Sequence, residues 1–294
     1  MVWIKGRSHG TFHILQDSVR TAGNGKSLYT NVTSSEGTYD ADGYISSLDA
    51  NGFTVAGGVQ TIGSGRTYAA WCWKAGGTVS ANNNSNGDIT STVSANQDAG
   101  FSIVSFTKTN GNAETIGHGL GAIPELIIMK TTGSSGGDWQ VYAAPIGNTK
   151  RLNLNLTAAQ STSGIWNNTT PTDEVFTTTF NPSTTIIAYC FHSVDGYQKI
   201  GSFTGNGSTN GPIVTTGFRP RFLMWKATST TGNWNIVDSI RSPLVDKRNY
   251  LYADLSQGED VTSYDIVDFN DDSFQMKQQY TNKSGHTYIY LAIA

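Results

Sequence analysis

Two short motifs carry the residue types that chemistry most often needs. The sequence DSVR at residues 17–20 returns as DSIR at 238–241, with an aspartate, a serine and an arginine at the same spacing. Such a group could contact a polar ligand, or serve a nucleophile if the fold brought a histidine to it. The simpler interpretation is that Asp17 and Asp238 accept turn hydrogen bonds and pair with Arg20 and Arg241. We favour it and keep the four residues as candidate ligand contacts.

Three tryptophans lie next to turn residues, where a ring could be exposed to a ligand. Sugar rings stack their C–H faces on indole rings, while asparagine and aspartate take up the hydroxyl groups. Trp139, Trp166 and Trp234 are therefore candidate sugar contacts. Trp139 and Trp234 hold matching places in a repeat described below, so the favoured alternative is that both fill a core. Trp166 has no counterpart.

The sequence carries no recognisable motif for a metal ion or a cofactor. The five histidines form neither a His-x-His nor a His-Glu-x-x-His pattern, and neither cysteine has the neighbouring ligands of a zinc site. The acidic run at 268–272 lacks the glutamate that completes a calcium loop, and the glycine-rich run at 204–211 opens no helix. We expect no metal, no cofactor and no catalytic residue, and thus no enzyme.

The composition narrows the class of partner. Charged residues make up 14% of the 294 residues and the formal net charge is −3, with lysine and arginine scattered along the chain. No basic stripe could neutralise phosphates, which argues against nucleic acid as a partner. No apolar run is long enough to insert into a membrane, and the opening MVWIKGRSHG lacks the apolar stretch of a signal peptide.

The elements that must position these residues occur three times. A closing strand reads TYAAWCWK at 67–74, TIIAYCFH at 185–192 and TYIYLAIA at 287–294. Upstream of each, an apolar run ends on a lysine: Lys5, Lys130 and Lys226. An aromatic residue follows each run: Phe12, Trp139 and Trp234. At 46–48 residues beyond each lysine a phenylalanine opens a further strand: Phe53, Phe176 and Phe274. Spacing held this closely indicates an internal repeat.

The second and third copies begin with a leader, residues 101–121 and 198–218, whose two extended stretches around an Asn-Gly turn are typical of a β-hairpin. We predict an all-β fold of three tandem antiparallel β-sandwich repeats: repeat 1 (1–74), repeat 2 (101–197) and repeat 3 (198–294). Repeat 1 lacks its leader hairpin. The favoured interpretation is that this lobe is trimmed; the alternative is that another chain adds strands at the unpaired edge.

Three further expectations concern packing. Residues 75–100, called the arm below, are rich in Gly, Asn, Ser and Thr and are predicted to be a linker or surface arm. The closing strands are apolar on both faces, which predicts that the second face meets a neighbouring repeat or subunit. Cys72 and Cys190 hold equivalent places in separate repeats, so both are predicted to be buried thiols rather than a disulfide.

Several of these stretches carry a family resemblance. The residues VWIKGRS, DSVRTAG, HGLGAIPELIIMK, GDWQVYAAPIGNTKRLNLN and TGFRPRFLMWK resemble a repeat family of marine bacteriophages, especially those of cyanobacteria. The resemblance covers nearly the whole chain outside 75–100 and implies a virion structural protein such as a tail fibre, a head fibre or a surface decoration. A single repeat is also similar in strand order to H-type lectins, which bind sugars and form trimers.

The resemblance implies a tail or head fibre, or another surface protein, that attaches to the phage particle and contacts host surface glycans. A capsid decoration protein without a receptor role and a glycan depolymerase are the alternatives. The expected partners are other virion proteins, host surface polysaccharide and further copies of the chain in a homo-oligomer, such as a trimer. The expected location is the virion, after assembly in the host cytoplasm.

Overall fold

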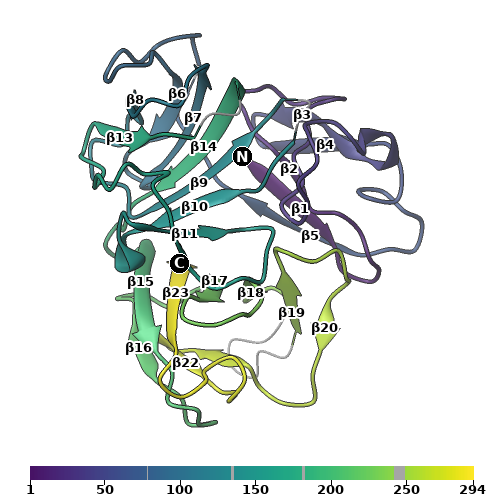
Figure 1. Cartoon of the computed structure of the whole chain (residues 1–294). Coiled ribbons are helices and arrows are strands. Elements are labelled where there is room, and N and C mark those ends of the chain that lie inside the picture. The colour runs from purple at the N-terminus through teal and green to yellow at the C-terminus, as the bar shows by residue number, and fades with distance from the viewer. Residues whose placement is uncertain (78, 134–135, 181–182, 242–248) are drawn as a thin grey trace.

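Antiparallel strands make up nearly all of the regular structure of the chain (Figure 1). The computed structural model describes residues 1–77, 79–133, 136–180, 183–241 and 249–294. Within these residues, strands β1 to β23 are accompanied by two single-turn 3-10 helices, η1 and η2. The prediction of an all-β sandwich fold is confirmed.

The strands follow the repeats along the chain. Repeat 1 holds β1 (Val2–Gly6), β2 (Ile14–Gln16), η1 (Asp40–Asp42), β3 (Tyr44–Asp49), β4 (Gly52–Ala56) and β5 (Tyr68–Cys72), and the arm holds β6 (Thr92–Asn96). Repeat 2 holds β7 (Phe101–Lys108), β8 (Glu114–Gly117), β9 (Leu126–Thr131), β10 (Gln140–Ala143), η2 (Ala144–Ile146), β11 (Lys150–Asn153), β12 (Ser161–Thr162), β13 (Val175–Thr178) and β14 (Thr184–Phe191). Repeat 3 holds β15 (Gln198–Thr204), β16 (Ile213–Thr215), β17 (Phe222–Ala227), β18 (Asn235–Asp238), β19 (Asn249–Tyr252), β20 (Asp260–Val261), β21 (Val267–Phe269), β22 (Ser273–Met276) and β23 (Thr287–Ile293).

Each repeat sets a larger sheet against a smaller one. The larger sheets run β2-β1-β5 in repeat 1, β12-β11-β10-β9-β14-β7-β6 in repeat 2 and β15-β23-β17-β18-β19-β20 in repeat 3. The smaller sheets are β3-β4, β13-β8 and β16-β22-β21. In all three repeats the strand that carries the lysine pairs with the closing strand, β1 with β5, β9 with β14 and β17 with β23.

The leader is not the hairpin that we predicted. Strand β7 pairs with β14 in the larger sheet, whereas β8 pairs with β13 in the smaller one, and β15 and β16 divide in the same way. A two-residue Asn-Gly turn would fold the chain back on itself, but residues 109–113 form a longer connection that crosses between sheets about 10 Å apart. The leader thus gives one strand to each sheet. Among its described residues, repeat 1 has no counterpart of either strand.

The aromatic position shared by the repeats is His13 in repeat 1, and our choice of Phe12 was wrong. In each repeat the residue before the lysine pairs with the first residue of the following strand. The position just before that strand is therefore His13, Trp139 or Trp234. Phe12 instead stacks on Tyr39, with ring centroids 4.2 Å apart, in a core that belongs to repeat 1 alone.

Alternate residues of the paired strands face two different cores, because successive side chains of a strand point to opposite faces. One side of every larger sheet faces a central core shared by all three repeats, with Trp3, Ile128 and Met224 at matching positions. The other side faces a core confined to one repeat, with Ile4, Met129 and Trp225 at the matching positions. Strands β14 and β23 contribute to both kinds of core, which accounts for their two apolar faces.

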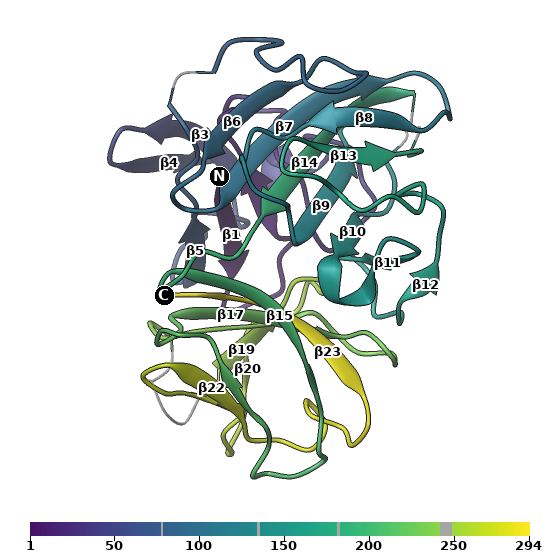
Figure 2. The same cartoon turned by 90° about the vertical axis from the view of Figure 1, so that its left-hand side faces the viewer.

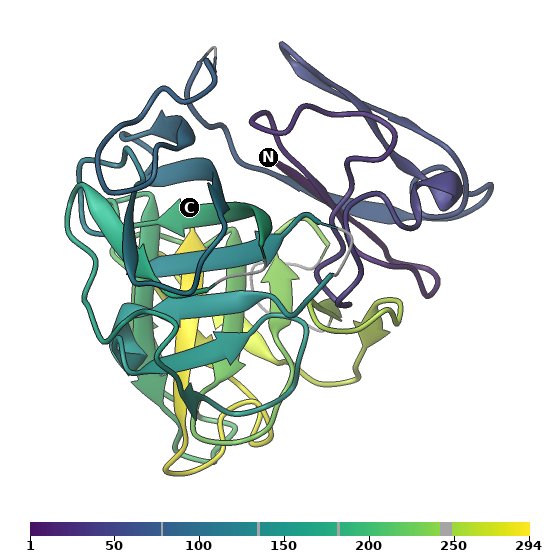
Figure 3. The same ribbon diagram turned by 45° about the horizontal axis from the view of Figure 1, so that its top comes forward.

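Buried lysines bind the repeats into a closed ring, in which repeat 3 lies beside the other two (Figures 2 and 3). The Nζ atoms of Lys130, Lys226 and Lys5 donate to the carbonyls of Thr33, Thr157 and Ser256 at 2.9, 2.9 and 3.1 Å. The same three carbonyls accept the backbone N–H of Gly137, Gly232 and Thr11. Repeat 2 thus donates to repeat 1, repeat 3 to repeat 2, and repeat 1 to repeat 3, so the cycle is complete.

The arm is more than the predicted linker. Its strand β6 pairs along β7 as the outermost strand of the repeat 2 sheet, and Val93 packs into the core of repeat 2. The described residues contain no helix long and apolar enough to cross a bilayer.

Candidate functional site

The motif at 17–20 forms a buried ion network. One carboxylate oxygen of Asp17 accepts the backbone N–H groups of Val19 and Arg20, both at 3.0 Å. The guanidinium of Arg20 donates to the other oxygen of Asp17 at 2.7 Å and to Glu36 at 2.8 Å. The structure therefore shows the turn hydrogen bonds and the ion pair of the simpler interpretation.

Repeat 3 builds the same network from the motif at 238–241. Asp238 accepts the N–H groups of Ile240 and Arg241 at 3.1 and 2.9 Å, and Arg241 donates to Asp238 at 2.6 Å and to Glu259 at 2.5 Å. Burial alone would raise the pKa of Asp238 and of Asp17, yet the adjacent arginine holds each pKa below its ordinary value. Both carboxylates are ionised at neutral pH.

An aromatic donor from the next repeat completes each network. The hydroxyl of Tyr189 donates to Asp17 at 2.7 Å, and the indole N–H of Trp71 donates to Asp238 at 3.1 Å. Arg241 also lies 5.7 Å from the centroid of the Trp71 ring, within cation–π range. The motif is therefore a joint between repeats. At the corresponding joint of repeats 2 and 3, both positions are apolar: Ala143 and Leu291.

The three candidate tryptophans are all buried. The indole N–H groups of Trp139 and Trp234 donate to the carbonyls of Tyr29 and Asn153, both at 2.9 Å, and so tie each repeat to the one before it. In repeat 1 the equivalent bond comes from His13, whose Nε2 lies 2.8 Å from the carbonyl oxygen of Tyr252 in repeat 3. Trp166 packs edge-on against Tyr142 in the core of repeat 2. Since a sugar platform needs an exposed ring face, these positions support the alternative that we gave for Trp139 and Trp234, and Trp166 is likewise a core residue.

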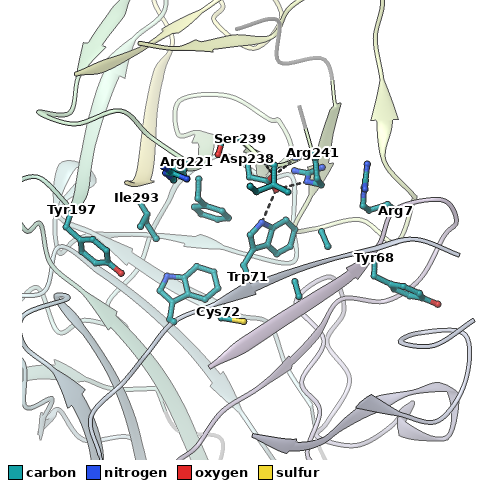
Figure 4. A pocket seen from close by; sticks show the side chains of 15 residues that line it. Arg7, Tyr68, Trp71, Cys72, Tyr197, Arg221, Asp238, Ser239, Arg241 and Ile293 are labelled. Carbon is teal, nitrogen blue, oxygen red and sulfur yellow. Dashed lines mark hydrogen bonds and ion pairs between the residues drawn. The ribbon is translucent and has the colours of Figure 1, made fainter. Parts of the chain in front are cut away.

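Two of the candidate residues, Asp238 and Arg241, line a cavity of about 370 Å³ between repeats 1 and 3 (Figure 4). Strand β5 with its neighbour Trp73 forms one wall, and residues 238–241 with Phe222 form the facing wall. Tyr197, the last residue of repeat 2, extends the lining together with Arg221 and Ile293 of repeat 3. Asp17, Arg20, Trp139, Trp166 and Trp234 do not line it.

The cavity presents apolar and aromatic surface above a neutralised ion network. Trp71 and Trp73 each pack edge-on against Phe222. The carboxylates of Asp238 and Glu259 are balanced by the guanidinium groups of Arg241 and Arg7. Such a wall suits an apolar side chain better than a charged ligand. Sequence reasoning named two of the lining residues, Asp238 and Arg241, but missed the aromatic wall, because Trp71 and Phe222 lie far apart in the chain.

Cys72 corrects a second expectation. Both cysteines are free thiols, but only Cys190 is buried, whereas Cys72 is exposed beside the cavity. Their strand positions are equivalent; the difference is that β7 covers the edge of β14, while β5 has no such cover among the described residues. The described residues also contain no group of three or more His, Cys, Asp or Glu side chains placed to hold a metal ion.

Fold and site together define a class of protein in which one chain wraps three β-sandwich repeats around a shared core. The model of a domain of unknown function, DUF7483, matches residues 1–294, and the chain belongs to this family. No curated protein and no solved structure matches the chain.

Proposed function

We propose that the chain is a structural component of a phage virion, a tail or head fibre or another surface protein that attaches to the particle. The observation that carries the proposal is the use of buried polar side chains as joints between repeats. Lys130, Trp139 and Asp17 all bond across a repeat boundary. Their counterparts in repeat 3, Lys226, Trp234 and Asp238, do the same. A body locked in this way keeps its shape under load, which suits a particle component. The likeness of the repeats to virion proteins of marine phages supports the same role.

In this role the partners are other virion proteins, and the location is the virion. Mass spectrometry of particles purified through a density gradient tests the assignment. The chain is expected to co-migrate with the particles, and cryo-electron microscopy is expected to show its three lobes on their surface. Recovery of the chain only from the soluble fraction of the lysate would contradict the proposal.

A fibre that binds host polysaccharide and a decoration protein differ in one measurement. Because the three candidate indoles are buried, a sugar would have to use another surface. Binding of the purified protein to a glycan array or to host cells supports the fibre, whereas an absence of binding supports the decoration protein. Release of reducing ends from host polysaccharide would instead support the depolymerase.

A further inference from the structure

We propose that a β-strand from a partner polypeptide pairs with the open edge of β5 and fills the cavity between repeats 1 and 3. The partner's segment takes the place that the leader strands β7 and β15 hold in repeats 2 and 3. The proposal rests on a comparison among the three repeats and does not depend on the virion role.

Backbone geometry leaves one edge of β5 open. Among the described residues the strand has a single neighbour, β1. Trp73 donates its N–H to the carbonyl of Met1 at 2.9 Å, so the odd-numbered residues of this stretch bond toward β1. Since bonding direction alternates in antiparallel pairs, three residues direct N–H and C=O groups outward: Tyr68, Ala70 and Cys72. No hydrogen bond to these groups is present within the described residues. Such an edge accepts an added strand.

Side-chain burial shows that repeat 1 is exposed at the same place, where the other two repeats are covered. Ala70 and Cys72 are exposed, while the residues at these positions in the other repeats are buried: Ala188, Cys190, Tyr290 and Ala292. Phe53 of β4 is only partly buried, although Phe176 and Phe274 are fully buried. The leader covers these positions in repeats 2 and 3, so the exposed surface of repeat 1 matches the surface that the leader covers in the other two repeats.

The cavity lies where the first strand of that leader would run. In repeat 3, β15 packs beside η2 of repeat 2. The counterpart of η2 in repeat 3 is the segment 239–241, which lines the cavity opposite β5. Ile240 in this segment is 87% exposed, whereas its counterpart Val19 packs against the central core. An apolar strand laid along β5 would cover Ile240 as well.

The two resident leaders define the chemistry of the occupant. They share the pattern Ile-x-Ser-Phe-Thr in one register, at 103–107 and 200–204. Their isoleucines pair opposite Tyr189 and Leu291, the counterparts of Trp71. The partner's strand therefore places a branched aliphatic side chain over Trp71, inside the cavity, and an aromatic one opposite Tyr68. Main-chain bonds to the edge supply affinity, and these two side chains supply selectivity.

Alkylation of Cys72 in the full chain tests the proposal, with a synthetic peptide of residues 101–121 as the probe. The exposed thiol should react with a maleimide, while buried Cys190 serves as an internal control. Peptide on the edge of β5 should slow the reaction of Cys72 about tenfold at ten times its dissociation constant. The peptide is used without a tag, and its solubility is checked at the concentrations used. Unchanged alkylation of Cys72 at saturating peptide concentration would overturn the proposal.

Two matched controls separate edge pairing from mere coverage. The same peptide with a methyl group on the nitrogen of Val104 cannot make the bond that pairs Val104 with the counterpart of Ala70, and should not protect the thiol. In the protein, Ala70→Pro removes an outward N–H and spares the bonds to β1, so protection should also be lost. Equal protection by both peptides would refute edge pairing, even if the proline variant failed to fold.

A second copy of the chain is the competing occupant. If two copies paired their β5 edges, protection of Cys72 would rise with protein concentration in the absence of peptide, and light scattering would show a dimer. That result would overturn the assignment to a different polypeptide. A monomer whose thiol reacts at the same rate at every protein concentration supports it.

Discussion

Asp254 is the residue at which repeat 3 departs from the other two. Its carboxylate accepts the backbone N–H of Trp234 at 2.9 Å, a role that Asn31 and Asn155 fill in repeats 1 and 2. Burial raises the pKa of Asp254 to about 6, and its second oxygen lies buried without a hydrogen-bond partner among the described residues. An amide would meet the same need without the cost of a buried charge.

The raised pKa of Asp254 makes the stability depend on pH. Between about pH 4 and pH 6 the folded chain binds more protons at this residue than the unfolded chain, so the free energy of unfolding falls as pH rises. The loss is about 3 kcal/mol at most. Asp254→Asn should remove this contribution and stabilise the protein at pH 7, as urea unfolding at several pH values would show. An unchanged pH profile in the variant would contradict the assignment.

The residue scale also shows the limit of reasoning from sequence. The ion pair of Asp17 with Arg20 could be predicted because both partners lie within one turn. The hydrogen bond from Trp71 to Asp238 could not, because it joins residues 167 positions apart. His13 escaped notice because a histidine there performs the hydrogen bond that a tryptophan performs in the other repeats.

At the scale of elements, the lysine-bearing strands hold the ring together. Each lysine is fully buried, and burial lowers the pKa to about 8, which still leaves an ammonium group at neutral pH. Lys226 donates to the carbonyls of Thr157, Ala227 and Gly232 at 2.9, 3.1 and 2.8 Å.

Lys226→Met should therefore destabilise the protein by about 3 kcal/mol, because carbonyl groups between repeats 2 and 3 would lose their donor. Lys283→Met, at an exposed lysine of the same repeat, should change the stability by less than about 0.5 kcal/mol. Urea unfolding of both variants measures the difference. Equal stability of the two variants would show that the buried lysine is dispensable.

The positions of individual strands could be predicted from local sequence patterns, whereas the pairing of strands far apart in the chain could not. The strands that end on lysine and the closing strands could be located because apolar runs recur at a fixed spacing. The leader was assigned to the wrong pairing because an Asn-Gly sequence signals a turn but does not determine which strand its flanks will join. Strand β6 has low hydrophobicity and is ordered by its neighbour β7.

At the scale of the whole molecule, the shared core predicts cooperative unfolding. The central core draws side chains from all three repeats, so separating one repeat would expose that face to water. The full chain should unfold in a single calorimetric transition, with equal calorimetric and van't Hoff enthalpies. Residues 101–197 expressed alone should fail to form a stable monomer. Three resolved transitions, or a stable isolated repeat, would contradict this prediction.

Three joints occupy corresponding places around the ring: Asp17 with Tyr189, Asp238 with Trp71, and Ala143 with Leu291. In an assembly of identical subunits, one mutation would alter every joint together. Because the three repeats belong to one chain, a mutation at one joint leaves the other two unchanged. One joint can therefore be weakened while the other two keep their contacts. Unequal joints make the three sides of the ring different from one another, so that a neighbouring molecule can recognise one side and bind in a single orientation.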